Sequence, residues 1–195
     1  MSAKNSSTRA DYMEWDAMVT LVRRLYRDGD YQMSLLIGCG CFFGLRVSDL
    51  LPLTWDQLLD ADSITVKEKK TGKNRTIRVN SNFQKHIHDC FLMAKAKRED
   101  LCFANHRKGT PITVQWINRK LKMLRVKYHI KIEHFSTHTF RKTMGRHVVE
   151  MAGEKSEMAL IKLSELFGHS NVAITRIYLG LRQDELMETY ELLDF

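Results

Sequence analysis

The sequence predicts an α+β fold that is mainly α-helical and contains one small antiparallel β-hairpin. Apolar residues recur at helical spacing over most of the 195 residues. Strict alternation of apolar and polar residues occurs on the two sides of one basic turn, residues 68–74. The chain has only two prolines, and no Ser/Gly-rich linker divides it. We therefore expect a disordered lead-in over residues 1–10 and a single domain over residues 11–195.

Helical patterns fill the first quarter of the chain. The segment 14–27 carries apolar residues at helical spacing, which predicts an amphipathic helix. Residues 32–43 are apolar nearly all round, so we expect a buried helix that Gly44 ends. A short helical piece over residues 47–51 should stop at Pro52.

The hairpin and the remaining helices follow. Ile64 and Val66 belong to one predicted strand and Ile77 and Val79 to the other, with a polar and basic tip between them. The later helices are expected over residues 82–97, 113–128, 139–151 and 155–167, then in a short piece from near Ser170, and finally in an amphipathic tail over about 183–193.

Composition narrows the class of function. The formal charge is +8 and the sequence pI is near 9.4. This basic excess fits either a Lys-rich solvated surface or a polyanionic partner, and the partner is favoured because cations neutralise phosphate. The four cysteines lack the spacing of a metal site or a disulfide framework, which indicates a reduced, intracellular compartment. No signal peptide or bilayer-spanning segment is evident, so a membrane role is disfavoured.

Two segments place an arginine where it could bind an anion. His138 and Arg141 are three positions apart on a predicted helix, so both can face one anion, although a surface pair is the simpler interpretation. Arg46 follows a long apolar run and is either a helix-end residue that reaches water or a buried anion clamp. Asp49 could brace Arg46 through an ion pair.

Two further segments carry groups for proton transfer and nucleophilic attack. Lys70 stands at the hairpin tip, where it is either solvated or able to give a proton to an alkoxide leaving group. The neighbouring Lys69, Lys73 and Arg75 suit contact with a phosphate backbone. Tyr178, nine residues after His169, is either a packing residue or a nucleophile.

Taken together and in this order, these motifs resemble the tyrosine recombinase family, also called the phage integrase family. Residues 44–55 are similar to the first arginine segment of that family, and residues 137–145 are similar to the second. Residues 167–180 resemble the segment that carries the nucleophile, including the nine-residue step from histidine to tyrosine. The resemblance extends over about residues 14–190.

The resemblance implies how a scissile DNA phosphate would be bound. Arg46 and Arg141 would clamp its non-bridging oxygens. His138 and His169 would add hydrogen bonds, and His138 would also help to move the proton of the nucleophile.

The resemblance also implies the covalent chemistry. Tyr178 would attack phosphorus and form a 3′-phosphotyrosine link, while Lys70 would protonate the departing 5′-hydroxyl; Lys69 is the alternative for that role. Such a reaction needs neither a metal ion nor ATP nor another cofactor. The product would be integration, excision or inversion of DNA at specific sites.

Two other regions are expected to contact partners. The helix over residues 113–128 carries Arg119, Lys122 and Arg125 away from its apolar face, which fits either a solvated surface or double-stranded DNA. The tail over 183–193 either caps its own core or, as the resemblance implies, docks on a neighbouring protomer. We therefore expect a dimer on one DNA site and a tetramer when two sites are paired.

Three other functions remain open from the sequence. A type IB topoisomerase uses a similar set of residues, a DNA-binding module would need no tyrosine at position 178, and a metal-dependent nuclease would need an acidic cluster. Many family members carry a further N-terminal DNA-binding domain. We expect either a short recombinase in a bacterial cytoplasm or the catalytic domain of a longer integrase.

Overall fold

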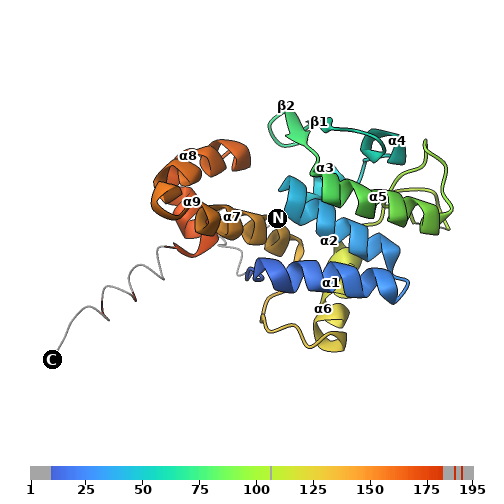
Figure 1. Cartoon of the computed structure of the whole chain (residues 1–195), viewed down its shortest axis with the longest axis horizontal. Helices are drawn as coiled ribbons and strands as arrows, with labels where there is room; N and C mark the ends of the chain where they lie inside the picture. Colours follow the sequence, from blue (N-terminus) through green and yellow to red (C-terminus); the bar gives the residue numbers. More distant parts are fainter. Residues whose placement is uncertain (1–9, 106, 182–186, 188–189, 191–195) are drawn as a thin grey trace.

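The structure, a computed structural model, describes residues 10–105, 107–181, 187 and 190 (Figure 1). The expected lead-in lies outside these residues except for Ala10, and the expected tail helix lies outside them except for Met187 and Tyr190. The helices and strands are α1 (Trp15–Arg27), α2 (Tyr31–Phe43), α3 (Val47–Leu50), α4 (Trp55–Leu58), β1 (Ser63–Lys67), β2 (Asn74–Arg78), α5 (Ser81–Ala94), α6 (Val114–Lys127), α7 (Thr137–Ala152), the 3-10 turn η1 (Gly153–Lys155), α8 (Ser156–Phe167) and α9 (Val172–Leu179).

Helix α2 lies at the centre of the larger core, with α1, α5 and α7 packed around it. Small residues let its neighbours approach closely. A β-carbon on Gly40 would lie 2.5 Å from the Phe140 ring of α7, and one on Gly38 would lie 2.6 Å from the Phe83 ring of α5. Cys39 and Cys41 are fully buried and unpaired, as expected of small core residues. Close packing on α2 fixes the position of α7, which carries the second arginine segment.

The hairpin pairs Ile64 with Ile77 in an antiparallel register, as the alternation predicts. Beyond the strands, the Glu68 N–H donates to the Lys73 carbonyl at 3.0 Å, and the Gly72 N–H donates to the Glu68 carbonyl at 2.8 Å. These two bonds define the basic tip, which lies at the top of the view in Figure 1.

Several boundaries differ from those expected. Helix α7 starts at Thr137, two residues early, because the Ser136 side chain caps it, so His138 lies in the first helical turn. Helix α5 ends at Ala94, where Lys95 adopts a left-handed conformation with φ 50°. Helix α4 was not predicted, since its four residues are too few to show a period.

A second, smaller core joins α7, α8 and α9. Its buried residues are Leu160, Leu163, Phe167 and Leu179. Gly145 of α7 allows the contact, because a β-carbon there would lie 2.5 Å from Leu179 Cδ2. The group of helices at the left of Figure 1 therefore carries Tyr178 on a core of its own.

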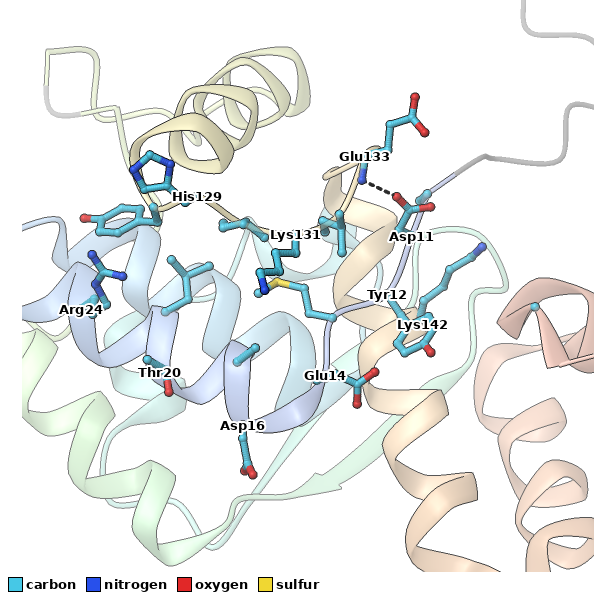
Figure 2. Close-up of a pocket in the computed structure, with 18 of the residues that line it drawn as sticks. Asp11, Tyr12, Glu14, Asp16, Thr20, Arg24, His129, Lys131, Glu133 and Lys142 are labelled. Carbon is cyan, nitrogen blue, oxygen red and sulfur yellow. Dashed lines mark hydrogen bonds between the residues drawn. The ribbon is translucent and has the colours of Figure 1, made fainter. Parts of the chain in front are cut away.

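The segment before α1 crosses the loop that precedes α7. The Asp11 carboxylate accepts from the N–H groups of Glu133 at 2.7 Å and His134 at 2.8 Å, and Figure 2 shows the first of these bonds. A groove of about 890 Å³ lies between this segment, α1 and residues 128–133. None of the six candidate catalytic residues lines it. Among the described residues, no helix is long and apolar enough to cross a membrane.

Candidate active site

Arg46 and Arg141 converge on one backbone carbonyl. Arg46 Nη2 donates to the Phe167 oxygen at 3.0 Å, and Arg141 Nη2 donates to the same oxygen at 3.3 Å. Arg141 Nη1 also donates to the Gly44 oxygen at 2.6 Å, and its guanidinium lies 4.4 Å from the centre of the Phe167 ring. Burial lowers the pKa of Arg141 to about 10, so it stays charged at neutral pH. The structure thus brings together three segments that are far apart in the sequence.

Arg75 does not point outward from the hairpin, as expected for a residue that contacts DNA. Its guanidinium points inward and donates to the Phe43 oxygen at 2.8 Å, the Leu166 oxygen at 3.3 Å and the Gly44 oxygen at 3.5 Å. These carbonyls lie at the ends of α2 and α8, where helices leave acceptors unpaired and carry partial negative charge. The Arg75 side chain is 15% exposed. Its hydrogen bonds connect the C-terminal end of α2 to the C-terminal end of α8.

Glu68, rather than Asp49, is the acidic partner of Arg46. Glu68 Oε2 lies 3.3 Å from Arg46 Nη1, whereas Asp49 Oδ1 accepts the Lys69 N–H at 3.0 Å. The expected ion pair between Arg46 and Asp49 is therefore wrong. The Asp49 carboxylate instead binds the backbone of the hairpin tip. Asp49 is 2% exposed, and its Oδ2 has no hydrogen-bond partner among the described residues.

The hairpin tip lies beside the turn that follows α8. A β-carbon on Gly168 would lie 3.8 Å from Arg46 Nη2 and 3.9 Å from Thr71 Cγ2. Lys69 and Lys70 precede Thr71 and are both exposed. Because Lys70 directly precedes Thr71, it lies at the edge of the same site, and its charge contributes to the lowered pKa of His169.

His169 is held by a side chain of α9. Its Nδ1 lies 2.9 Å from the hydroxyl of the fully buried Thr175, so the orientation of the ring is fixed and Nε2 is left for another partner. Burial, then the charges of Arg141, Arg46 and Lys70, lower the pKa of His169 to about 4. The imidazole is therefore neutral at neutral pH.

Tyr178 lies against His169, with their ring centres 5.2 Å apart. Its hydroxyl donates to the His138 carbonyl at 3.5 Å, which is a long and weak bond, and its oxygen also interacts with the Arg141 guanidinium. Burial raises the pKa of Tyr178, while the charges of Arg141 and Arg46 act in the opposite direction. Loss of hydration, then the charges of Arg141 and Lys142, lower the pKa of His138. All six candidate catalytic residues thus lie in or beside one cluster.

The other candidate DNA contacts lie on the surface. Lys69 and Lys73 are exposed at the hairpin tip, and Arg119, Lys122 and Arg125 are exposed on α6. Helix α6 contacts the start of α7, where Asn118 Oδ1 accepts the Thr137 N–H at 3.2 Å. The hairpin and α6 lie on opposite sides of α1 and α2 in Figure 1.

Comparison with known proteins assigns the family. Residues 16–185 match the Phage integrase family. This chain belongs to the phage integrase family. It is 28% identical over 147 residues to the probable integrase/recombinase YoeC of Bacillus subtilis (strain 168), and the alignment covers 75% of this chain and 76% of YoeC. It is 30% identical over 149 residues to the tyrosine recombinase XerC of Xanthomonas campestris pv. campestris (strain B100), which covers 76% of this chain and 44% of XerC.

Solved structures of phage integrase relatives share the fold. The XerH recombinase bound to its palindromic difH substrate superposes with a TM-score of 0.68 at 18% identity, over 93% of this chain and 53% of XerH. The lambda integrase catalytic core gives 0.57 at 16% identity, over 82% of this chain and 91% of that core. The predicted family and the mainly helical α+β fold are confirmed. The chain spans about half the length of XerC and XerH.

Three groups of this integrase-family site were missed from the sequence: the carboxylate of Glu68, the carbonyl of Phe167 and the hydroxyl of Thr175. Glu68 could have been found, because the alternation of the buried Ile64 and Val66 continues to position 68, one residue beyond the end of β1. The other two depend on how α8 and α9 pack, and no pattern in the sequence gives that packing.

Proposed function

We propose that this chain cleaves and rejoins DNA at specific sites through a covalent 3′-phosphotyrosine intermediate on Tyr178. The observation that carries the proposal is the convergence of Arg46 and Arg141 on the Phe167 carbonyl, next to Tyr178 and His169. Membership of the phage integrase family and similarity to tyrosine recombinases support the same reaction.

The two arginines would stabilise the transition state. Negative charge grows on the non-bridging oxygens of a phosphoryl group during transfer, and fixed cations that face them lower the barrier. Arg46 and Arg141 are already held in place by backbone carbonyls, so little reorganisation is needed when the phosphate arrives. His138 and a neutral His169 would donate further hydrogen bonds to the same oxygens.

Tyr178 would supply the covalent step. Its oxygen forms a bond to phosphorus as its proton leaves, with His138 assisting, and the bond from phosphorus to the 5′ oxygen breaks. That oxygen takes its proton from Lys70, with Lys69 as the alternative donor. The phosphotyrosine link conserves the energy of the phosphodiester, so the reverse attack by a 5′-hydroxyl rejoins a strand without ATP.

The partners follow from the same proposal. Double-stranded DNA would lie along the exposed cations of the hairpin tip and α6, which contact the backbone and carry no sequence information directly. Two protomers would occupy one site and four would join two sites, with residues 183–193 docking on a neighbour. We place the protein in a bacterial cytoplasm, on the nucleoid when it acts.

The deciding experiment is covalent trapping on a nicked DNA substrate from a candidate recombination site, without divalent metal. Wild-type protein and the matched control Tyr31→Phe should form an adduct that survives denaturation, and Tyr178→Phe should form none. An adduct in Tyr178→Phe would disprove the assigned nucleophile. No adduct from wild type on DNA that it binds would favour a binding module, and relaxation of a supercoiled plasmid that lacks recombination sites would favour a topoisomerase.

A further inference from the structure

Glu68 occupies the point where the hairpin tip meets the arginine cluster. One carboxylate oxygen, Oε2, accepts from the Thr71 hydroxyl at 2.9 Å and lies 3.3 Å from Arg46 Nη1. The other oxygen, Oε1, lies 3.7 Å from Arg75 Nη1. The residue is only 6% exposed. Two arginines and one hydroxyl therefore share a single buried carboxylate.

The charge of Glu68 is maintained despite its burial. Burial alone would raise its pKa, but the Thr71 hydrogen bond and the charges of Arg46, Arg75 and Arg141 outweigh that effect and leave the pKa below its usual value. A carboxylate beside Arg46 also opposes the binding of a phosphate there. A carboxylate at this position is therefore expected to have a role that offsets its unfavourable effect on phosphate binding.

That role is visible in the backbone of the tip. Glu68 N–H and C=O pair with Lys73 and Gly72, while its side chain reaches forward to Thr71. Lys69 and Lys70 lie between Glu68 and Thr71 in the sequence, so the Glu68–Thr71 bond closes the turn that carries both lysines. The same carboxylate oxygen also binds Arg46. The closed turn is therefore attached to Arg46 and Arg141, the arginine pair proposed to bind the phosphate and called the phosphate clamp below.

We propose that Glu68 is a positioning residue that locks the lysine turn onto Arg46, so that the proton donor and the phosphate clamp form one unit before DNA binds. This inference rests on the proposed function, in which Lys70 or Lys69 protonates the leaving 5′ oxygen. Glu68 itself touches neither the phosphate nor the leaving group; it acts through the turn and through Arg46.

The chemistry of the leaving group separates this role from a general effect on the fold. A 5′-alkoxide leaves as it gains a proton, whereas a 5′-thiolate leaves without one because thiols are far more acidic than alcohols. A DNA strand with sulfur in place of the bridging 5′ oxygen therefore bypasses the lysine. Loss of the Glu68 lock should slow cleavage of ordinary DNA and largely spare cleavage of sulfur-bridged DNA.

The experiment measures single-turnover adduct formation on both substrates. Lys70→Ala and Lys69→Ala identify the proton donor, since the variant that lacks the donor recovers on sulfur-bridged DNA. Glu68→Ala and Thr71→Val should each slow the oxygen substrate about tenfold or more, the effect of losing a hydrogen bond to a charged group, and the sulfur substrate less than about threefold. Thr71→Val is the sharper variant, because it leaves the Arg46–Glu68 ion pair in place. Thr65→Val, an exposed position on the same hairpin, is the matched control and should leave both rates unchanged.

Equal slowing of Glu68→Ala and Thr71→Val on both substrates would overturn the proposal, because Glu68 would then act on the arginines or on the fold. Rates like those of wild type would overturn it as well. Failure of the proposed function is distinct: wild-type protein would then form no Tyr178-dependent adduct on either substrate.

Discussion

Replacement of Arg141 by lysine tests whether the fork of the guanidinium assembles the site. Arg141 is 5% exposed and donates to two carbonyls, Gly44 at 2.6 Å and Phe167 at 3.3 Å. A lysine ammonium keeps the charge but cannot reach both acceptors in the same planar geometry. The Arg141→Lys variant therefore loses at least one charge-assisted hydrogen bond while burying a cation of the same sign.

The expected loss of stability follows from those two bonds. A hydrogen bond to a charged group contributes about 1.5–3 kcal/mol. Loss of both would double that figure, but Arg46 still donates to the Phe167 oxygen, and Arg75 lies 3.5 Å from the Gly44 oxygen. Neither acceptor is left without a donor, so we expect a decrease in the free energy of unfolding of about 1.5–3 kcal/mol in total.

Activity should fall further than stability. Loss of one preorganised donor to a developing oxyanion costs about 10²–10³ in rate. Urea unfolding gives the free energy, and single-turnover adduct formation, at a temperature where the variant is folded, gives the rate. Arg27→Lys, an exposed arginine at the end of α1, is the matched control. A stability change below about 0.5 kcal/mol, with a rate within threefold of wild type, would refute the role of the fork.

Two further predictions test the backbone and the histidine of the site. Gly44 has φ 57°, and a β-carbon there would overlap Met144 Sδ, near the end of a flexible side chain that must move, so Gly44→Ala should cost about 2–3 kcal/mol by urea unfolding. Gly109→Ala, with φ 64° and open space, should cost only about 1–2 kcal/mol, and equal costs would disprove the steric reason. The pKa of His169 is lowered to about 4, below the value of about 6.5 in an unfolded chain. The contribution of the neutral imidazole to stability should therefore be complete above about pH 6.5 and lost as the pH falls through about 4. An imidazole NMR titration with a midpoint near 6.5 would contradict this prediction.

One simple rule accounts both for what the sequence predicted in the hairpin and for what was missed there. Alternation identified the strands, and the same alternation puts Glu68 on the face of Ile64 and Val66, and Arg75 on the face of Ile77. From the sequence, Glu68 is expected in the polar tip and Arg75 in contact with a phosphate backbone. In the structure they lie on the inner face, where Glu68 forms ion pairs with both Arg75 and Arg46. A charged residue in phase with the apolar face of a strand was therefore informative.

Other features lie beyond sequence patterns for physical reasons. The order of the motifs pointed to Arg46, Arg141 and Tyr178, because each stands in a recognisable local segment. Their geometry depends on the Phe167 carbonyl, a group that every residue has and no pattern marks. Helix α4, with its Thr54 capping box, is too short for a periodic signal. Local rules thus gave the parts of the site, and only tertiary packing gave their arrangement.

The two hydrophobic cores explain why Arg141 is a suitable junction. Helix α7 packs on the larger core through Phe140 and on the smaller one through Gly145, and Arg141 lies between these positions. Its guanidinium donates to Gly44, which follows α2 of the larger core, and to Phe167, which ends α8 of the smaller core. The fork therefore exists in this form only when both cores are docked on α7. Under the proposed function, the same docking that completes the fold would bring Tyr178 to the phosphate clamp, so that clamp and nucleophile are assembled in one step.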